Sequence, residues 1–314
     1  MTKSPRSLAR AAGLHKSGRR HLGERAIAAL LFLAASVSIV TTLAVIVALS
    51  AETVAFFADP AVTFREFFTA REWTPLFPAS QRVFGISPLI IGTLMVTSVA
   101  LVVGLPLGLG SAIYLSEFAS ARTRRTVMPI LEVLAGIPTV VLGYFALFFV
   151  TPILRDVVPG LNLFNPLSAG LVMGFMILPT ISSISTDSMQ AVPRSLREAG
   201  YGLGASRYEV VLKVVVPAAL SGIVASFILA ASRAIGETMI VTLAAGQKPT
   251  FTFDLRETIA TMTSFIVQAA TGDQPAGSIA SRALYAVGAT LFVMTLILNV
   301  VSQQVVRRFG ERYE

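Results

Sequence analysis

Two charged residues, Arg233 and Glu237, interrupt an otherwise apolar stretch at residues 218–245. An Arg at the centre of a membrane-spanning helix costs about 2.5–3.5 kcal/mol on insertion scales, so a charge kept there predicts a function. A spacing of four residues lets the two side chains pair on one helix face, and Gly236 leaves space beside them. A guanidinium suits an oxyanion. We therefore predict an anion-binding position; the alternative is an ion pair that only fixes helix packing.

A second group of residues lies in the polar segment EAGYGLGASRYEVVLKVVVP, residues 198–217. It begins with Glu198, Ala199 and Gly200. Gly204 lacks a Cβ and so permits a turn between two short helices. Pro217 fits the first turn of the following helix, where its missing N–H is not needed. The spacing predicts two short helices that meet at Gly204, between two long apolar segments; an ordinary amphipathic loop is the alternative.

Residues for several kinds of enzyme chemistry are missing from the sequence. It contains no GxxxxGK[ST] motif, so we expect no ATP-phosphate site in this chain. Its two histidines, His15 and His21, precede the first apolar segment, and no HExxH occurs. With no cysteine, thiolate metal sites and disulfides are excluded. We predict that the chain is not an enzyme and has no metal or cofactor of its own.

The elements that must position these residues are six apolar segments, each long enough for the roughly 20 residues that cross a bilayer. The chain has 314 residues, 54% hydrophobic and 13% charged, with a mean hydropathy of +0.74. The predicted fold class is an all-α integral membrane protein with six transmembrane helices, because lipid-facing backbone must be helical. The expected spans are residues 26–49, 83–116, 127–151, 166–185, 218–245 and 283–306.

The distribution of Lys and Arg predicts the orientation. Residues 1–25, 116–126, 187–213 and 307–314 hold 17 of the 25 Lys and Arg residues, and the three intervening loops hold seven. This bias places both termini in the cytosol. It also explains the net charge of +8 without nucleic acid as a partner. The predicted organisation is a basic cytosolic tail at 1–25 that binds anionic lipid, a first span and external loop at 26–82, and a transmembrane domain at 83–314.

Two external stretches carry helical patterns. Phe64, Phe67 and Phe68 have helical spacing with Trp73 close behind, which predicts an amphipathic piece in the membrane interface or a docking surface. Residues 255–266 carry apolar side chains on one helical face, which predicts an interfacial or re-entrant helix.

The segment 198–217 resembles the EAA signature of ABC-importer permeases. Glu198, Ala199, Gly204 and Pro217 match that signature in register, and Gly200 stands where it has a second Ala. The stretches LAGIPTVVLGYF, RAIGETMIVTLAAG and FIVQAATGDQPAGS are similar to the PstC-type permease subunits of phosphate ABC importers, and the likeness covers about residues 83–312.

This resemblance implies a type I importer permease (MetI-like) core of five helices preceded by one more, in the bacterial inner membrane. The coupling segment, residues 187–217, would dock on a dimer of ATPase subunits that bind ATP and Mg. A PstA-like second permease would complete the pathway, and a periplasmic phosphate-binding protein would dock on loops 51–82, 152–165 and 247–281. Arg233 would meet the phosphate, and Glu237 would hold Arg233 in place.

Two alternatives remain at this point. A permease of the same fold could carry sulfate, molybdate or an amino acid, because Arg233 fits any anion. A channel without an ATPase is the second alternative.

Overall fold

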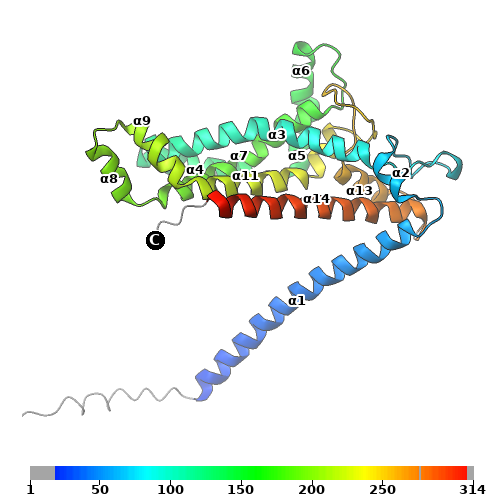
Figure 1. Cartoon of the computed structure of the whole chain (residues 1–314), viewed down its shortest axis with the longest axis horizontal. Helices are drawn as coiled ribbons and strands as arrows, with labels where there is room; N and C mark the ends of the chain where they lie inside the picture. The colour runs from blue at the N-terminus through cyan, green and yellow to red at the C-terminus, as the bar shows by residue number, and fades with distance from the viewer. Residues whose placement is uncertain (1–17, 276, 310–314) are drawn as a thin grey trace, which may run out of the picture. The chain divides into compact units, whose positions relative to one another are not determined.

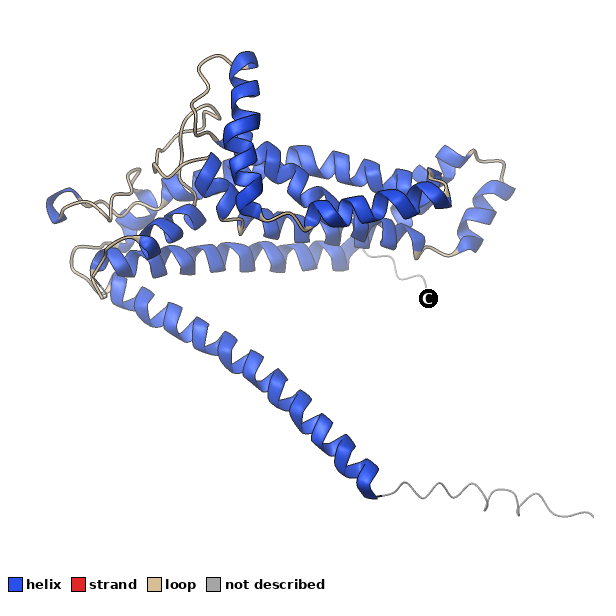
Figure 2. Ribbon diagram, turned by 180° about the vertical axis from the view of Figure 1, so that it is seen from behind, coloured by secondary structure: helices blue, strands red, loops and turns tan. Residues whose placement is uncertain are grey.

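The computed structural model describes residues 18–275 and 277–309, with side chains for residues 24–275 and 277–304. Helices joined by loops make up this part of the chain, and the described ranges contain no strand beyond one bridged pair, Trp73 and Phe84 (Figure 2). The all-α prediction is therefore confirmed. The predicted basic tail lies outside the described residues up to residue 17. The chain divides into two units, residues 1–51 and 52–314.

Helix α1, Gly18–Phe57, supplies nearly all of the described first unit. In this unit, up to residue 51, apolar side chains are exposed on every face of the helix, including those of Leu30, Phe32 and Val47. A helix that is apolar all round is typical of a membrane span. It begins earlier and ends later than the predicted span of 26–49.

The second unit is built around α7, Pro166–Gln190, which is the most buried of its long helices. Helix α3, Ser87–Ile113, lies along α7, and α11, Leu220–Ile235, packs on both (Figure 1). Close approach depends on glycine: a Cβ at Gly104 would lie 2.8 Å from Ile177, and one at Gly108 would lie 2.7 Å from Ile181. Small residues bring membrane helices together in this way. Helix α14, Ile279–Phe309, runs beside α11.

The third span begins later than the sequence predicted. Helix α4, Ala121–Ala135, is amphipathic and ends before Gly136, and the chain then resumes at α5, Thr139–Phe145. A π-helical turn, Ala146–Val150, and α6, Thr151–Val157, continue α5 into a 19-residue apolar helix, Thr139–Val157. The prediction of one span at 127–151 is wrong, because Pro138 disfavours helical backbone in the preceding residue and so separates the two helices.

The fifth span is broken. Helix α9, Arg207–Val210, continues through a π-helical turn, Val211–Val215, into α10, Val216–Ala218, and the chain then bends by 69° into α11. A second break at residues 236–238 precedes α12, Met239–Ala244. The continuous helix predicted at 218–245 is thus wrong. The described residues contain five helices that are long and apolar enough to span a membrane, or six when the bent pair counts as one, in agreement with six spans.

We define the outer end of the second unit as residues 52–86 and 246–275, since the charge bias predicts that it faces outward. Helix α2, Phe64–Thr69, forms as predicted, and a short 3-10 turn, Ala79–Gln81, follows. The interfacial prediction is wrong for Phe67 and Trp73, which are only 1% and 2% exposed. They pack with Phe56, Phe84 and Phe265 in the aromatic cluster of the outer end, where Trp73 lies edge-on to Phe265 at 5.1 Å between ring centroids.

Helix α13, Met262–Thr271, occupies only part of the helix expected at residues 255–266. The hydroxyl of Thr261 accepts a hydrogen bond from the backbone N–H of Ser264 at 3.1 Å, which starts the helix there. The prediction is therefore wrong for Leu255 and Ile259, which precede α13.

Candidate functional site

Arg233 and Glu237 do not form the ion pair that their spacing predicts. Helix α11 ends at Ile235, so the two residues lie on either side of a break instead of on one helix face. The Oε1 of Glu237 accepts hydrogen bonds from the backbone N–H groups of Met239 at 2.9 Å and Ile240 at 3.3 Å. A carboxylate at this position satisfies the unpaired donors of a helix start. Glu237 therefore caps α12, and within the described chain no ion pair joins it to Arg233.

The guanidinium of Arg233 lies on an exposed surface of α11. Its Nη1 donates a hydrogen bond to the Oγ1 of Thr180, on α7, at 3.2 Å. Thr180 also lines a hollow of about 260 Å³ between α4 and α7, together with Glu132. The structure thus places Arg233 where several of its N–H donors are open to a ligand or a partner chain.

The segment 198–217 contains the two short helices that the sequence predicts. Helix α8, Arg194–Gly202, and α9 meet at a turn in which Gly204 has a φ of +82°, a backbone conformation that favours glycine. A Cβ at Gly200 would lie 3.0 Å from a methyl group of Val210, so a small residue there lets α8 lie against the following helix. Pro217 lies in the first turn of α10, so its predicted position at a helix start is confirmed. That helix is short, however, and does not begin a continuous span.

Helix α8 and the residue that follows it present both polar and apolar side chains to the surroundings. Glu198 and Ala199 are exposed, and Leu203, just after the helix, is 91% exposed. Ser206 starts α9 in a capping box with Glu209, whose Oε2 accepts a hydrogen bond from the backbone N–H of Ser206 at 3.0 Å. The result is a compact pair of short helices with an apolar side chain at its tip.

Comparison with known families decides the identity. The family described as "Binding-protein-dependent transport system inner membrane component" matches residues 104–314. The chain belongs to this family. It is a transmembrane permease subunit of an ABC importer and a multi-pass protein of the bacterial inner membrane.

Individual relatives are similar to this permease over most of their length. A probable ABC transporter permease protein YqgH of Bacillus subtilis is 34% identical over 74% of each chain. The phosphate transport system permease protein PstC of Mesorhizobium japonicum is 32% identical over 78% of this chain and 79% of its own. A PstC of Haemophilus influenzae is 32% identical over 76% and 80%. The likeness to PstC-type permeases is thereby confirmed.

Solved structures support the fold of the permease. A chain of the bacterial alginate ABC transporter, in complex with its alginate-bound periplasmic protein, aligns with a TM-score of 0.64 at 16% identity and covers 93% of this chain and 98% of its own. A chain of the MetNI methionine transporter, in an inward-facing conformation, aligns with a TM-score of 0.55 at 19% identity, over 72% and 95%. The MetI-like core is thus present.

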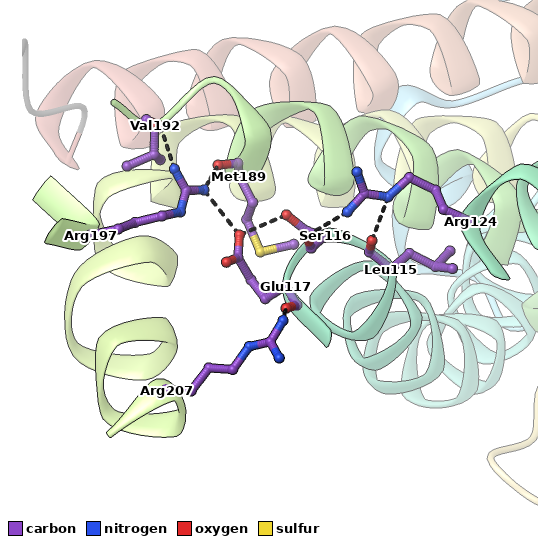
Figure 3. A network of polar contacts seen from close by, with 8 residues as sticks. All are labelled: Leu115, Ser116, Glu117, Arg124, Met189, Val192, Arg197 and Arg207. Atoms are coloured by element: carbon purple, nitrogen blue, oxygen red, sulfur yellow. Dashed lines mark hydrogen bonds and ion pairs between the residues drawn. The ribbon is translucent and has the colours of Figure 1, made fainter. Parts of the chain in front are cut away.

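The sequence did not reveal the polar network that links α8 to the end of α3 in the permease (Figure 3). Arg197, next to Glu198, forms an ion pair with Glu117 at 3.0 Å, and both side chains are mostly buried, at 17% and 11% exposure. The two residues are 80 positions apart, so no local pattern connects them. The only local signal was the position of Arg197 beside the EAA-like residues.

Proposed function

We propose that this permease carries phosphate inward as one half of a translocation pathway, with a PstA-like permease as the other half. Its similarity to phosphate permeases across most of both chains carries the proposal. A periplasmic phosphate-binding protein would deliver the anion to the external loops 51–82, 152–165 and 247–281. ATP and Mg would be bound and used by two ATPase subunits rather than by this chain.

In this proposal Arg233 lines the pathway and receives the phosphate. A guanidinium exposed to lipid is costly, so its surface requires water, an anion or a partner chain. Phosphate oxygens accept charge-assisted hydrogen bonds from arginine, often two at once. Thr180 holds Nη1 on one side, which leaves donors of Arg233 for the anion. Glu237 acts on the pathway indirectly, because its cap of α12 fixes the break beside Arg233.

The coupling segment would transmit the ATPase cycle to the pathway. Glu198, Ala199 and Gly200 lie on α8, and the exposed Leu203 gives that tip an apolar contact for an ATPase groove. Burying such a side chain at an interface stabilises it by about 1.5–3 kcal/mol. Residues 198–217 would move as a unit with the ATPase, with Gly204 at the turn between α8 and α9 and Pro217 at the end of the segment.

Uptake by the purified complex in proteoliposomes tests the proposal. The complex of this permease, its partner permease and the ATPase is reconstituted with ATP in the lumen, and the binding protein and labelled phosphate are added outside. We expect ATP-dependent uptake that unlabelled phosphate suppresses and that sulfate and molybdate leave unchanged. Arg233→Ala should lower uptake about 10- to 100-fold, which corresponds to the loss of hydrogen bonds to a charged group.

Ser232→Ala is the matched control. Ser232 precedes Arg233 on the same helix, but its hydroxyl donates to Asn299 on α14 at 3.0 Å and so points to a packing contact. We expect its uptake to stay close to wild type. Normal uptake by Arg233→Ala would remove that residue from the pathway, and equal competition by sulfate would remove phosphate specificity. Phosphate uptake by the wild-type complex without ATP would contradict the proposed coupling to the ATPase.

A further inference from the structure

Three arginines from separate segments converge on the C-terminal end of α3, at the π-helical turn Tyr114–Phe118 (Figure 3). Arg124, on α4, donates through Nε to the carbonyl of Leu115 at 2.8 Å and through Nη2 to that of Ser116 at 2.6 Å. Arg207, on α9, donates to the carbonyl of Glu117. The last carbonyls of a helix have no partners within it, and cations are favourable there. The side chains of Arg124 and Arg207 therefore satisfy the last carbonyls of this helix and stabilise its C-terminal end.

Arg197 differs from the other two because it joins three elements. Its Nη2 donates to the carboxylate of Glu117, after α3, and to the carbonyl of Met189, on α7, at 2.7 Å. Its Nη1 donates to the carbonyl of Val192, just after α7, at 2.5 Å. The hydroxyl of Ser116 donates to the same Glu117 oxygen at 2.9 Å, which orients the carboxylate. One guanidinium thus ties α8 to the ends of α3 and α7.

Apolar packing does not fix α8 in the same way. None of the nine described residues of α8 is buried, and Leu196 is only partly buried against the apolar cluster beneath it. The chain leaves α8 through Pro193 at one end and through the turn at Gly204 at the other. Without Arg197, these two connections and a few shallow contacts would determine how α8 moves.

We infer that Arg197 is the positioning residue through which a displacement of α8 reaches α3 and α7. The inference rests on the proposed function, since it supposes an ATPase docked on α8. Helices α3 and α7 pack along one another through their glycines, so a pull at their shared end moves them together. A planar guanidinium that donates in three directions maintains this connection, whereas an ammonium group has no fixed fork of donors.

The experiment measures phosphate imported per ATP hydrolysed by the reconstituted complex. In Arg197→Ala we expect the ATPase subunit to copurify in wild-type amount and ATP hydrolysis to continue. The ratio of phosphate imported to ATP hydrolysed should fall about tenfold or more, because charged hydrogen bonds are lost. Arg197→Lys should be intermediate. Arg122→Ala is the control, since it removes the same charge from an exposed position on α4 and should leave the ratio unchanged.

A covalent replacement separates transmission from a structural role. The chain contains no cysteine, so Glu117→Cys with Arg197→Cys introduces a unique thiol pair in this subunit. We expect a low ratio for the untreated double variant and recovery of the ratio after a short bifunctional thiol reagent joins the two residues. Each single-cysteine variant given the same reagent should not recover.

Several outcomes would overturn the inference while leaving the proposed function intact. One is a wild-type ratio in Arg197→Ala. Another is loss of the ATPase subunit from the purified Arg197→Ala complex, which would mean that Arg197 shapes the docking surface. A third is a cross-linked pair that stays uncoupled. Failure of the proposed function would instead appear in the wild-type complex, as an absence of ATP-dependent phosphate uptake.

Discussion

At the outer end of the second unit, aromatic rings hold the loops to the helices, whereas at the end that carries α8 and α9, arginine side chains donate to helix carbonyls. The ring centroids of Phe56 and Phe84 lie 5.4 Å apart, and those of Phe67 and Trp73 lie 6.1 Å apart, all edge to face. At the other end the contacts are charged hydrogen bonds of 2.5–3.0 Å around Arg197.

The difference has a physical consequence for motion. Apolar burial is non-directional, and the rings of the outer end pack against one another in one cluster, so their contacts are expected to be lost together. Charged hydrogen bonds are directional, so those around Arg197 hold α8 to the ends of α3 and α7 although α8 itself is not buried. Elements that move are drawn from regions with few buried apolar contacts, and α8 has no buried residue. The comparison predicts a stable outer end and a coupling segment that moves together with the ends of α3 and α7.

The largest effect should come from the aromatic cluster. Trp73→Ala removes a ring that is 2% exposed, and large-to-small changes of this kind cost about 3–5 kcal/mol of unfolding free energy. Circular dichroism during thermal unfolding in detergent measures the change. Phe77→Ala, at an exposed position on the same loop, should cost less than about 0.5 kcal/mol. Equal shifts in the two variants would contradict the contrast between the ends.

A smaller effect should follow from changes in the turn between α8 and α9. Gly204→Ala places a Cβ on a residue with a φ of +82°, which costs about 1–2 kcal/mol of backbone strain. No atom lies within 4 Å of that Cβ, so a steric clash adds nothing to this cost. Gly202→Ala is the matched change, since it also meets open space but lies in α8, and it should stabilise the helix by about 0.5–1 kcal/mol. Hydrogen exchange of residues 194–210 should rise in the first variant and fall in the second.

The smallest effect should be a response to acid in the outer loop. Hydrogen bonds from the side chain of Arg256 and, to a smaller extent, from its backbone N–H lower the pKa of Asp254 from 3.8 to about 2. A carboxylate with a lowered pKa stabilises the fold above its ordinary pKa, and this contribution is lost as the pH falls from about 4 to 2.

The rate of backbone hydrogen exchange at residues 252–257, corrected for its intrinsic pH dependence, should therefore rise on acidification. The rise should be less than about tenfold, because exposed ion pairs contribute little to stability. Asp254→Asn should remove the response. A response that persists in that variant would assign it to another group.

Local features were predictable from the sequence. The short helices around Gly204 follow from a glycine and a proline that lie within about fifteen residues of each other, and each of these acts on its own neighbourhood. The number of spans follows from hydropathy, because the bilayer fixes the length of an apolar helix.

Features that depend on distant residues or on helix breaks were not predictable in the same way. A spacing of four residues places Arg233 and Glu237 on one face only if a single helix contains both, and α11 ends between them at Ile235. Glu117 and Arg197 meet only because α3 and α7 end at the same level, which no local pattern encodes. Trp73 is typical of a membrane interface by residue type, but the aromatic rings around it bury it.

The bend of 69° between α10 and α11 makes this part of the permease an elbow rather than a rod. When one arm of an elbow slides along its own axis, the other arm is carried mostly sideways. Helix α11 carries Arg233 in its final turn, at the far tip of the second arm. A small displacement of the short helices would therefore move the Arg233 guanidinium across the proposed pathway rather than along it.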